Sequence, residues 1–239
     1  MEALSQSVLP TVLALQDARW DFAGAPRAAA AIVRVRPVVA AAQLSLAADL
    51  ALSYFVALAG GTARNLLLSE PLAPAAAAQA FLPIFVAVWL LAVTAPSLLL
   101  FLPTRLAVNA INALSRIRSV AGAVAAASVA LGPGNPLGVA LVGIAQAAGQ
   151  TLALVALRRL LGQPPVAGDT ATLGFPVVSA VAAGAGLAAT HGGPHHGAVL
   201  ATLTLWFVGQ AVLATLASAL STAPPTKKAA AKDKKDKKE

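Results

Sequence analysis

FLPTRLAVNAINALSRIRSV, at residues 101–120, is the stretch that decides the fold, because it has the pattern of an apolar helix with polar side chains on one face. Steps of four, three, four and three residues separate its five polar positions, Arg105, Asn109, Asn112, Arg116 and Ser119. At about 3.6 residues per turn, this spacing places all five on one stripe. From Arg105 to Arg116 the stripe rises about 16 Å, roughly half of a hydrocarbon core. Such a stripe requires water, a polar ligand or an equally polar neighbouring helix.

The composition around this stretch is that of a membrane protein. Hydrophobic residues make up 58% of the 239 residues and charged residues only 11%, whereas charged residues are about 25% of a typical soluble domain. The mean hydropathy of +0.78 agrees with this assignment. We therefore expect an integral membrane protein whose alanine-rich helices pack closely through small side chains. The absence of cysteine excludes disulfides and thiolate metal sites.

Seven apolar segments follow one another along the chain and are candidates for membrane spans. The first is the weakest because Asp17, Arg19 and Asp21 interrupt it, and the sixth is short. The third and fourth are continuous except for Pro96 and Pro103, which predict a turn or kink between them. The segments lie at about residues 4–24, 37–63, 78–97, 98–120, 136–157, 175–190 and 197–220.

An internal repeat predicts how these segments are arranged. LPTVLAL at residues 9–15 matches LPTRLAV at residues 102–108, at an offset of 93, and a second set of matches has an offset of 94. Three spans in each repeat would make the second copy run opposite to the first. The sequence thus predicts an all-α membrane protein with seven transmembrane helices, arranged as two inverted three-helix repeats plus a seventh helix and a disordered lysine-rich tail. The predicted units are residues 1–97, 98–196, 197–220 and 221–239.

The charges predict the orientation. The chain carries a net charge of +8, and every lysine lies in the tail at residues 227–238, whose composition is typical of a solvated, disordered segment. Lys235 and Lys237 also match a K-x-K-x-x retrieval signal of endoplasmic-reticulum membrane proteins. With the tail in the cytosol, most arginines of the body fall on or near the cytosolic side, in agreement with the positive-inside rule. These arginines are Arg27, Arg34, Arg36, Arg105, Arg158 and Arg159.

Several short segments, taken in order, resemble the trimeric intracellular cation channels (TRIC channels). They are ARNLLLSEPL at residues 63–72, AVW at 87–89 followed by Pro96, FLPTRLAVNAINALSRIR at 101–118, GIAQAAG at 143–149, Phe175 with Pro176, and the lysine-rich end. The resemblance implies a homotrimer with a separate ion pathway in each subunit. It also implies potassium permeation across the endoplasmic or sarcoplasmic reticulum, or another intracellular membrane, as a counter-ion flow that balances calcium release.

The resemblance also implies a lipid ligand, with departures in this chain. In the animal members a lysine and an arginine of the fourth helix hold a phosphoinositide headgroup. Arg116 stands at the arginine position, but Asn112 stands at the lysine position, and Gln146 replaces a basic residue of the fifth span. Asn112 and Arg116 are therefore the candidate lipid-binding residues, with one charge removed, and no other cofactor is expected.

Three polar stripes could enclose one aqueous path through the predicted bundle. The second span carries Asp49, Ser53, Gly60 and Arg64 on one face, and the fifth carries Gly143, Gln146 and Gln150 on another. The glycines either free backbone carbonyls for water and ions or serve as packing contacts. Arginines that lie within the transmembrane electric field could make the opening of such a path voltage-dependent. The candidate pore and gate residues are Asp49, Gly60, Gly61, Arg105, Asn109, Asn112, Arg116, Arg118, Gly143, Gln146 and Gly149.

Two other functions remain open on the sequence alone. A secondary transporter also uses inverted repeats with polar residues at the midplane. In a membrane scaffold, the polar stripes would only pair with one another and would conduct no ions. No motif supports an enzyme. His191, His195 and His196 lie in a Gly- and Pro-containing segment that predicts a solvent-exposed loop rather than a metal site. Nucleic-acid binding is not expected, because the arginines of the body are interspersed with apolar spans.

Overall fold

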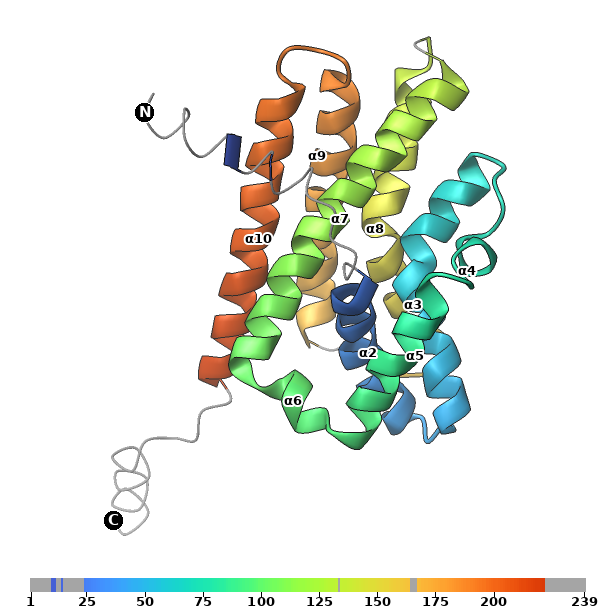
Figure 1. Ribbon diagram of the computed structural model, residues 1–239, viewed down its shortest axis with the longest axis vertical. Coiled ribbons are helices and arrows are strands. Elements are labelled where there is room, and N and C mark those ends of the chain that lie inside the picture. Colours follow the sequence, from blue (N-terminus) through green and yellow to red (C-terminus); the bar gives the residue numbers. More distant parts are fainter. Residues whose placement is uncertain (1–9, 12–13, 15–23, 133, 164–166, 222–239) are drawn as a thin grey trace.

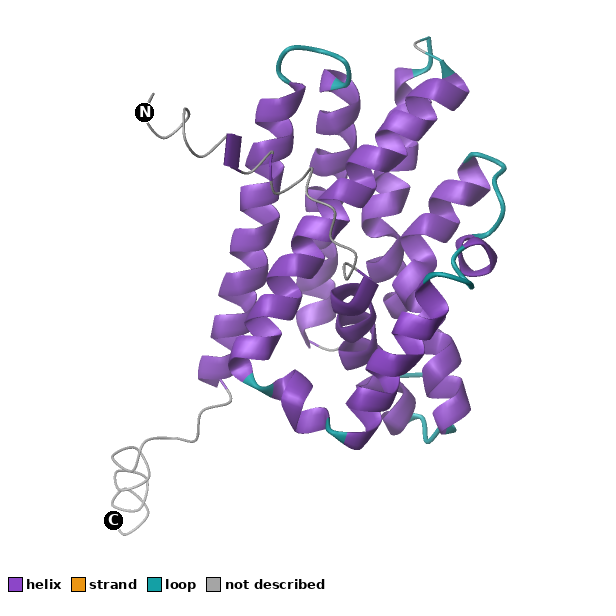
Figure 2. Ribbon diagram, in the orientation of Figure 1, coloured by secondary structure: helices purple, strands orange, loops and turns teal. Residues whose placement is uncertain are grey.

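The structure, a computed structural model, describes residues 10–11, 14, 24–132, 134–163 and 167–221, with the backbone alone for 167–177 and 221. Within these residues every regular element is a helix and none is a strand (Figure 2). Four helices are long and apolar enough to cross a membrane: α3 (Leu46–Leu67), α7 (Leu102–Leu131), α8 (Pro136–Leu160) and α10 (His196–Ser221). The predicted all-α fold is confirmed.

Helix α7 is the longest element and runs from one end of the bundle to the other (Figure 1). Its 30 residues correspond to about 45 Å. The predicted break before it is confirmed. Helix α5 (Phe81–Thr94) stops, the short α6 (Pro96–Leu100) changes direction, and Phe101 is extended before α7 begins with Pro103 in its first turn. Each proline stands where a helix starts, where a missing N–H costs nothing.

Helix α2 (Gly24–Ala41) corrects the sequence-based prediction for this region. The expected spans at 4–24 and 37–63 left residues 25–36 as a connection, yet these residues are helical and α3 starts only at Leu46. Three arginines lower the hydropathy here, but the opposite face of α2 is fully buried, including Ala28, Ala31, Ile32 and Val35. Residues 4–24 lie mostly outside the described residues.

The remaining spans follow the prediction more closely. The segments at 136–157 and 197–220 correspond to α8 and α10. The sixth predicted span corresponds to α9 (Ala167–Thr190), which starts eight residues before the predicted residue 175. A four-residue helix, α4 (Ala73–Ala76), precedes α5. The turn between α9 and α10 contains His191 and His195. The lysine-rich tail, with Lys235 and Lys237, lies outside the described residues.

Small residues allow the helices of the interior to approach closely. Helix α8 packs against α3, α7 and α9. A Cβ added at Gly149 would stand 2.5 Å from Gly60 Cα, so α3 and α8 meet backbone to backbone. A Cβ at Gly143 would stand 3.0 Å from Gly184 Cα of α9. These contacts use the packing mode of membrane helices, in which glycine lets two backbones touch.

The outer surface carries large apolar side chains, as a lipid environment requires. Phe55, Leu141, Trp206 and Leu213 are more than half exposed. In water such a surface would associate, whereas hydrocarbon accommodates it without cost.

Candidate functional site

A cavity of about 450 Å³ lies in the middle of the bundle, between α2, α3, α4, α7 and α8. We call it the central cavity. It contains the middle of the polar stripe of α7 and polar side chains from the other helices. The polar and glycine residues in its lining are Arg27, Gly60, Gly61, Arg64, Asn65, Asn112, Arg116, Ser119, Gly122, Gln146 and Gln150.

Two arginines of the central cavity are held against its wall. Arg116 donates from Nε to the Ala147 carbonyl of α8 at 3.1 Å, and its Nη2 donates to the same oxygen. Its guanidinium also lies 5.7 Å from the ring centroid of Phe207 on α10, a cation–π distance. Arg27 of α2 donates to the Ser119 hydroxyl at 2.7 Å. Both side chains thus tie α7 to a neighbouring helix.

Two glutamines of α8 are incompletely hydrogen-bonded in the described part of the chain. Gln146 Oε1 and Gln150 Nε2 are buried and have no protein partner. Leaving a buried polar atom unpaired costs about 1–3 kcal/mol, and native proteins rarely accept this without water or a ligand. Both residues line the central cavity, so a rotation of either carboxamide would bring its unpaired atom to a space that water or an ion could occupy.

Two lining residues of the central cavity, Arg64 and Asn65, pair with the segment that joins α3 to α4. Arg64 forms an ion pair with Glu70 at 3.0 Å and donates to Asn65 Oδ1 at 2.8 Å. Asn65 in turn donates to the Pro71 carbonyl. No acidic residue of the described part of the chain lines the cavity, and Glu70 balances one of its arginines from outside the lining.

A second cavity of about 200 Å³ lies between α2, α6 and α7, and we call it the α6 cavity. The N-terminal part of the same polar stripe of α7, Arg105 and Asn109, lines this cavity. Arg105 donates to the Ser218 hydroxyl at 3.4 Å and Asn109 to the Thr215 hydroxyl at 2.8 Å, both on α10. Its full lining is Ala29, Ala30, Val33, Arg34, Leu99, Arg105, Val108 and Asn109.

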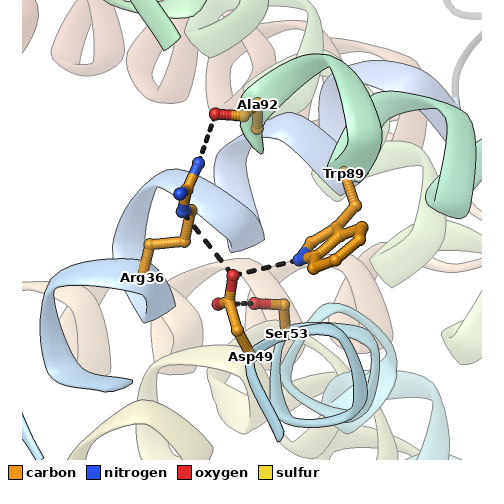
Figure 3. A network of polar contacts seen from close by, with 5 residues as sticks. All are labelled: Arg36, Asp49, Ser53, Trp89 and Ala92. Atoms are coloured by element: carbon orange, nitrogen blue, oxygen red, sulfur yellow. Dashed lines mark hydrogen bonds and ion pairs between the residues drawn. The ribbon is translucent and has the colours of Figure 1, made fainter. Parts of the chain in front are cut away.

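Asp49 lines neither cavity. It is 3% exposed and lies between α2, α3 and α5, as Figure 3 shows. Trp89 Nε1 donates to its Oδ2 at 3.0 Å and Ser53 Oγ to its Oδ1 at 3.3 Å, while Arg36 Nε lies 3.6 Å from Oδ2. Arg36 also donates to the Ala92 carbonyl. We call these residues the Asp49 network.

The structure divides the candidate residues among several places. The central cavity receives Gly60, Gly61, Asn112, Arg116 and Gln146, and the α6 cavity receives Arg105 and Asn109. Gly143 and Gly149 are in helix packing, and a Cβ at Gly61 would stand 3.2 Å from Ala73 Cβ. Neither cavity is lined by Arg118.

Sequence reasoning missed the contribution of α2. Arg27 lines the central cavity and Arg34 the α6 cavity. Their separation of seven residues, two helical turns, is the signal that could have placed both on one face.

The comparisons agree with this architecture. No family model and no curated protein matches the sequence. Among solved structures, a TRIC counter-ion channel studied for its activity in calcium release aligns with a TM-score of 0.74 at 18% identity, over 87% of this chain and 99% of that chain. The Caenorhabditis elegans (C. elegans) trimeric intracellular cation channel aligns without Ca²⁺ at 0.72 and 18%, over 90% and 97%, and with bound Ca²⁺ at 0.68 and 20%, over 89% and 98%. The chain thus has the fold of these channels over nearly its whole length.

Proposed function

We propose that this chain is a member of the TRIC channel family and conducts monovalent cations, potassium foremost, through the central cavity of each subunit. The shared fold supports the family, and the unpaired carboxamide atoms of Gln146 and Gln150 are the observation that carries the conducting path. A path for ions needs polar groups that the protein itself leaves unpaired, because permeation requires binding that is weak and repeatedly renewed.

The arginines of the central cavity do not prevent cation flow in this proposal. Arg116 is tied to the Ala147 carbonyl and Phe207, and Arg27 to Ser119. A cation would instead be coordinated by carboxamide oxygens such as that of Gln146, which accepts no hydrogen bond in the described structure. The two guanidiniums would hold an anionic headgroup or fix the helices around the path.

The wider architecture of the proposal follows the two-repeat arrangement. Helices α2, α3 and α5 would form the first repeat, α7, α8 and α9 the inverted second repeat, and α10 the seventh span. The repeats would assemble as a homotrimer in the endoplasmic reticulum or another intracellular membrane, with the C-terminal tail in the cytosol. There, potassium flow would balance calcium release.

A phosphoinositide headgroup remains part of the proposal despite Asn112. Arg27 lines the same cavity as Arg116, so a second guanidinium is available from α2 where the α7 position carries no charge. This arrangement would replace the missing lysine by an arginine from a different helix.

Purified protein in planar bilayers with a potassium chloride gradient tests the function. We expect unitary currents that reverse near the potassium equilibrium potential. Reversal near the chloride potential would contradict the proposal and assign the arginine-lined path to anions. A bilayer without current under any voltage would favour a scaffold.

A secondary transporter is the second candidate, since a polar cavity inside an inverted-repeat bundle also suits alternating access around a fixed site. Smooth, saturable potassium uptake into proteoliposomes, without current steps, would favour it over the channel.

A further inference from the structure

The two cavities lie one above the other along a single pair of helices, α2 and α7. On α2, Arg27 lines the central cavity and Ala30 lines the α6 cavity. On α7, Asn112 lines the central cavity and Asn109 the α6 cavity. Each pair is three residues apart, which is a rise of about 4.5 Å. The layer that separates the cavities is therefore about one helical turn thick.

This layer is made of small and polar side chains. Ala30 and Asn112 are buried, and no residue lines both cavities, so the two cavities are separate in this structure. The methyl group of Ala30 and the carboxamides of Asn109 and Asn112 lie within this layer.

A hydrogen bond holds the two helices together beside this layer. Arg27 of α2 donates to Ser119 of α7 at 2.7 Å, on the side of the central cavity. On the other side, Asn109 donates to Thr215, which fixes α7 to α10 rather than to α2. The contact that α2 must break to move along α7 is therefore the Arg27–Ser119 bond.

We infer that the layer formed by Ala30, Asn109 and Asn112 is the closed gate of the ion path, and that the Arg27–Ser119 hydrogen bond latches it. The inference rests on the proposed function, since it locates the gate of that path. Opening is a slide of α2 along α7 by 1–2 Å, the scale of ordinary shear between packed helices. The carboxamide oxygens of the two asparagines then meet the ion at the narrowest point.

Cysteine labelling tests the gate, because the chain contains no cysteine of its own. Gly122→Cys places a reporter in the central cavity, where an added Cβ has no atom within 4 Å. Val108→Cys places one in the α6 cavity. A membrane-impermeant, positively charged methanethiosulfonate reagent is applied to one side of sealed proteoliposomes, and labelling rates are measured from each side in turn.

Each reporter should react from one side only, with rates that differ by at least about tenfold between sides, and the preferred sides should be opposite. Ala30→Gly, which thins the layer, and Ser119→Ala, which removes the latch, should each reduce this sidedness by a similar factor. Ala28→Gly is the matched control: it makes the same substitution on the same helix, but at a residue buried against α3 and α5. It should leave the sidedness unchanged.

Three results would overturn the gate. The first is labelling of both reporters at equal rates from both sides. The second is unchanged sidedness in both Ala30→Gly and Ser119→Ala. The third is a loss of sidedness in Ala28→Gly as large as that in Ala30→Gly. Because labelling needs no current, failure of the channel proposal is seen separately, as preserved sidedness in a protein that passes no potassium in bilayers.

Discussion

The Asp49 network and the central cavity are both buried polar clusters that involve α2 and α3, but they differ in how completely their groups are paired. Both Asp49 carboxylate oxygens accept hydrogen bonds, and a cation stands beside one of them. In the central cavity, Gln146 Oε1 and Gln150 Nε2 have no partner among the described residues, and none of the described carboxylates lines the cavity to balance Arg116. A fully paired cluster holds helices together, whereas an incompletely paired one leaves room for water and ions.

The largest effect on stability should follow from Asp49→Ala. The change leaves Trp89 without its acceptor and Arg36 with the Ala92 carbonyl alone, and leaving a buried polar group unpaired costs about 1–3 kcal/mol, more when it is charged. Thermal unfolding in detergent, followed by circular dichroism, should show a markedly lower midpoint. Ser53→Ala, which removes only the 3.3 Å bond, should cost about 1 kcal/mol. An unchanged midpoint together with a loss of ion flux would place Asp49 in the ion path. It would then contradict the distinction between a structural Asp49 network and a conducting central cavity.

Gly149→Ala should have the next largest effect. The new methyl group would stand 2.5 Å from Gly60 Cα and force α3 and α8 apart, at a cost of about 1–3 kcal/mol. Gly122→Ala is the control, since its Cβ has open space, and it should stabilise α7 by about 0.5–1 kcal/mol. If the two variants unfold at the same temperature, the close crossing of α3 and α8 is not what supports the wall of the central cavity.

The same substitution in both clusters should separate them directly. Arg116→Gln removes a charge from the membrane interior, where that charge costs at least about 2.5 kcal/mol, so the lost bonds to Ala147 should be nearly offset. The unfolding midpoint should change little, while open probability and voltage dependence in bilayers change. Arg36→Gln should show the reverse pattern, with lower stability and unaltered gating. Unchanged gating in Arg116→Gln would remove that arginine from the functional site.

The smallest effect on stability should come from Gln150→Leu. An unpaired amide is replaced by an apolar group, so we expect a gain of up to about 1 kcal/mol, but a lower unitary conductance. Gln163→Leu provides the contrast, because Gln163 donates to the Val38 carbonyl and its loss should destabilise by about 1 kcal/mol. Destabilisation by Gln150→Leu would show that the amide has a partner after all.

Much of the fold could be predicted from the sequence, because apolar length and proline position are local properties. Helix α10 and the break between α5 and α7 follow from them directly. Helix α2 could not be found in this way. Average hydropathy counts each arginine as a cost, whereas Arg27 and Arg36 have partners inside the protein.

The candidate site could be predicted only in part, for a related reason. Helical periodicity identifies which residues share a face but does not say which neighbour covers each part of that face. The polar face of α3 is therefore split: Asp49 pairs with Trp89 of α5 and accepts from Ser53 on its own helix, whereas Gly60 and Arg64 line the central cavity. On α7 the stripe continues through both cavities, and Asn112 and Arg116 line the same one.

The position of the Asp49 network in the chain has a consequence for biogenesis. Arg36 and Asp49 lie on consecutive helices joined by a short turn between Ala41 and Leu46. Their opposite charges can therefore neutralise each other as soon as this hairpin leaves the ribosome, before Trp89 and Ala92 of α5 have emerged from it. The Arg36–Asp49 pair would enter the bilayer already neutralised, and the arrival of α5 would then lock it. A chain with the aspartate moved to a later helix would have to insert an unaccompanied arginine first.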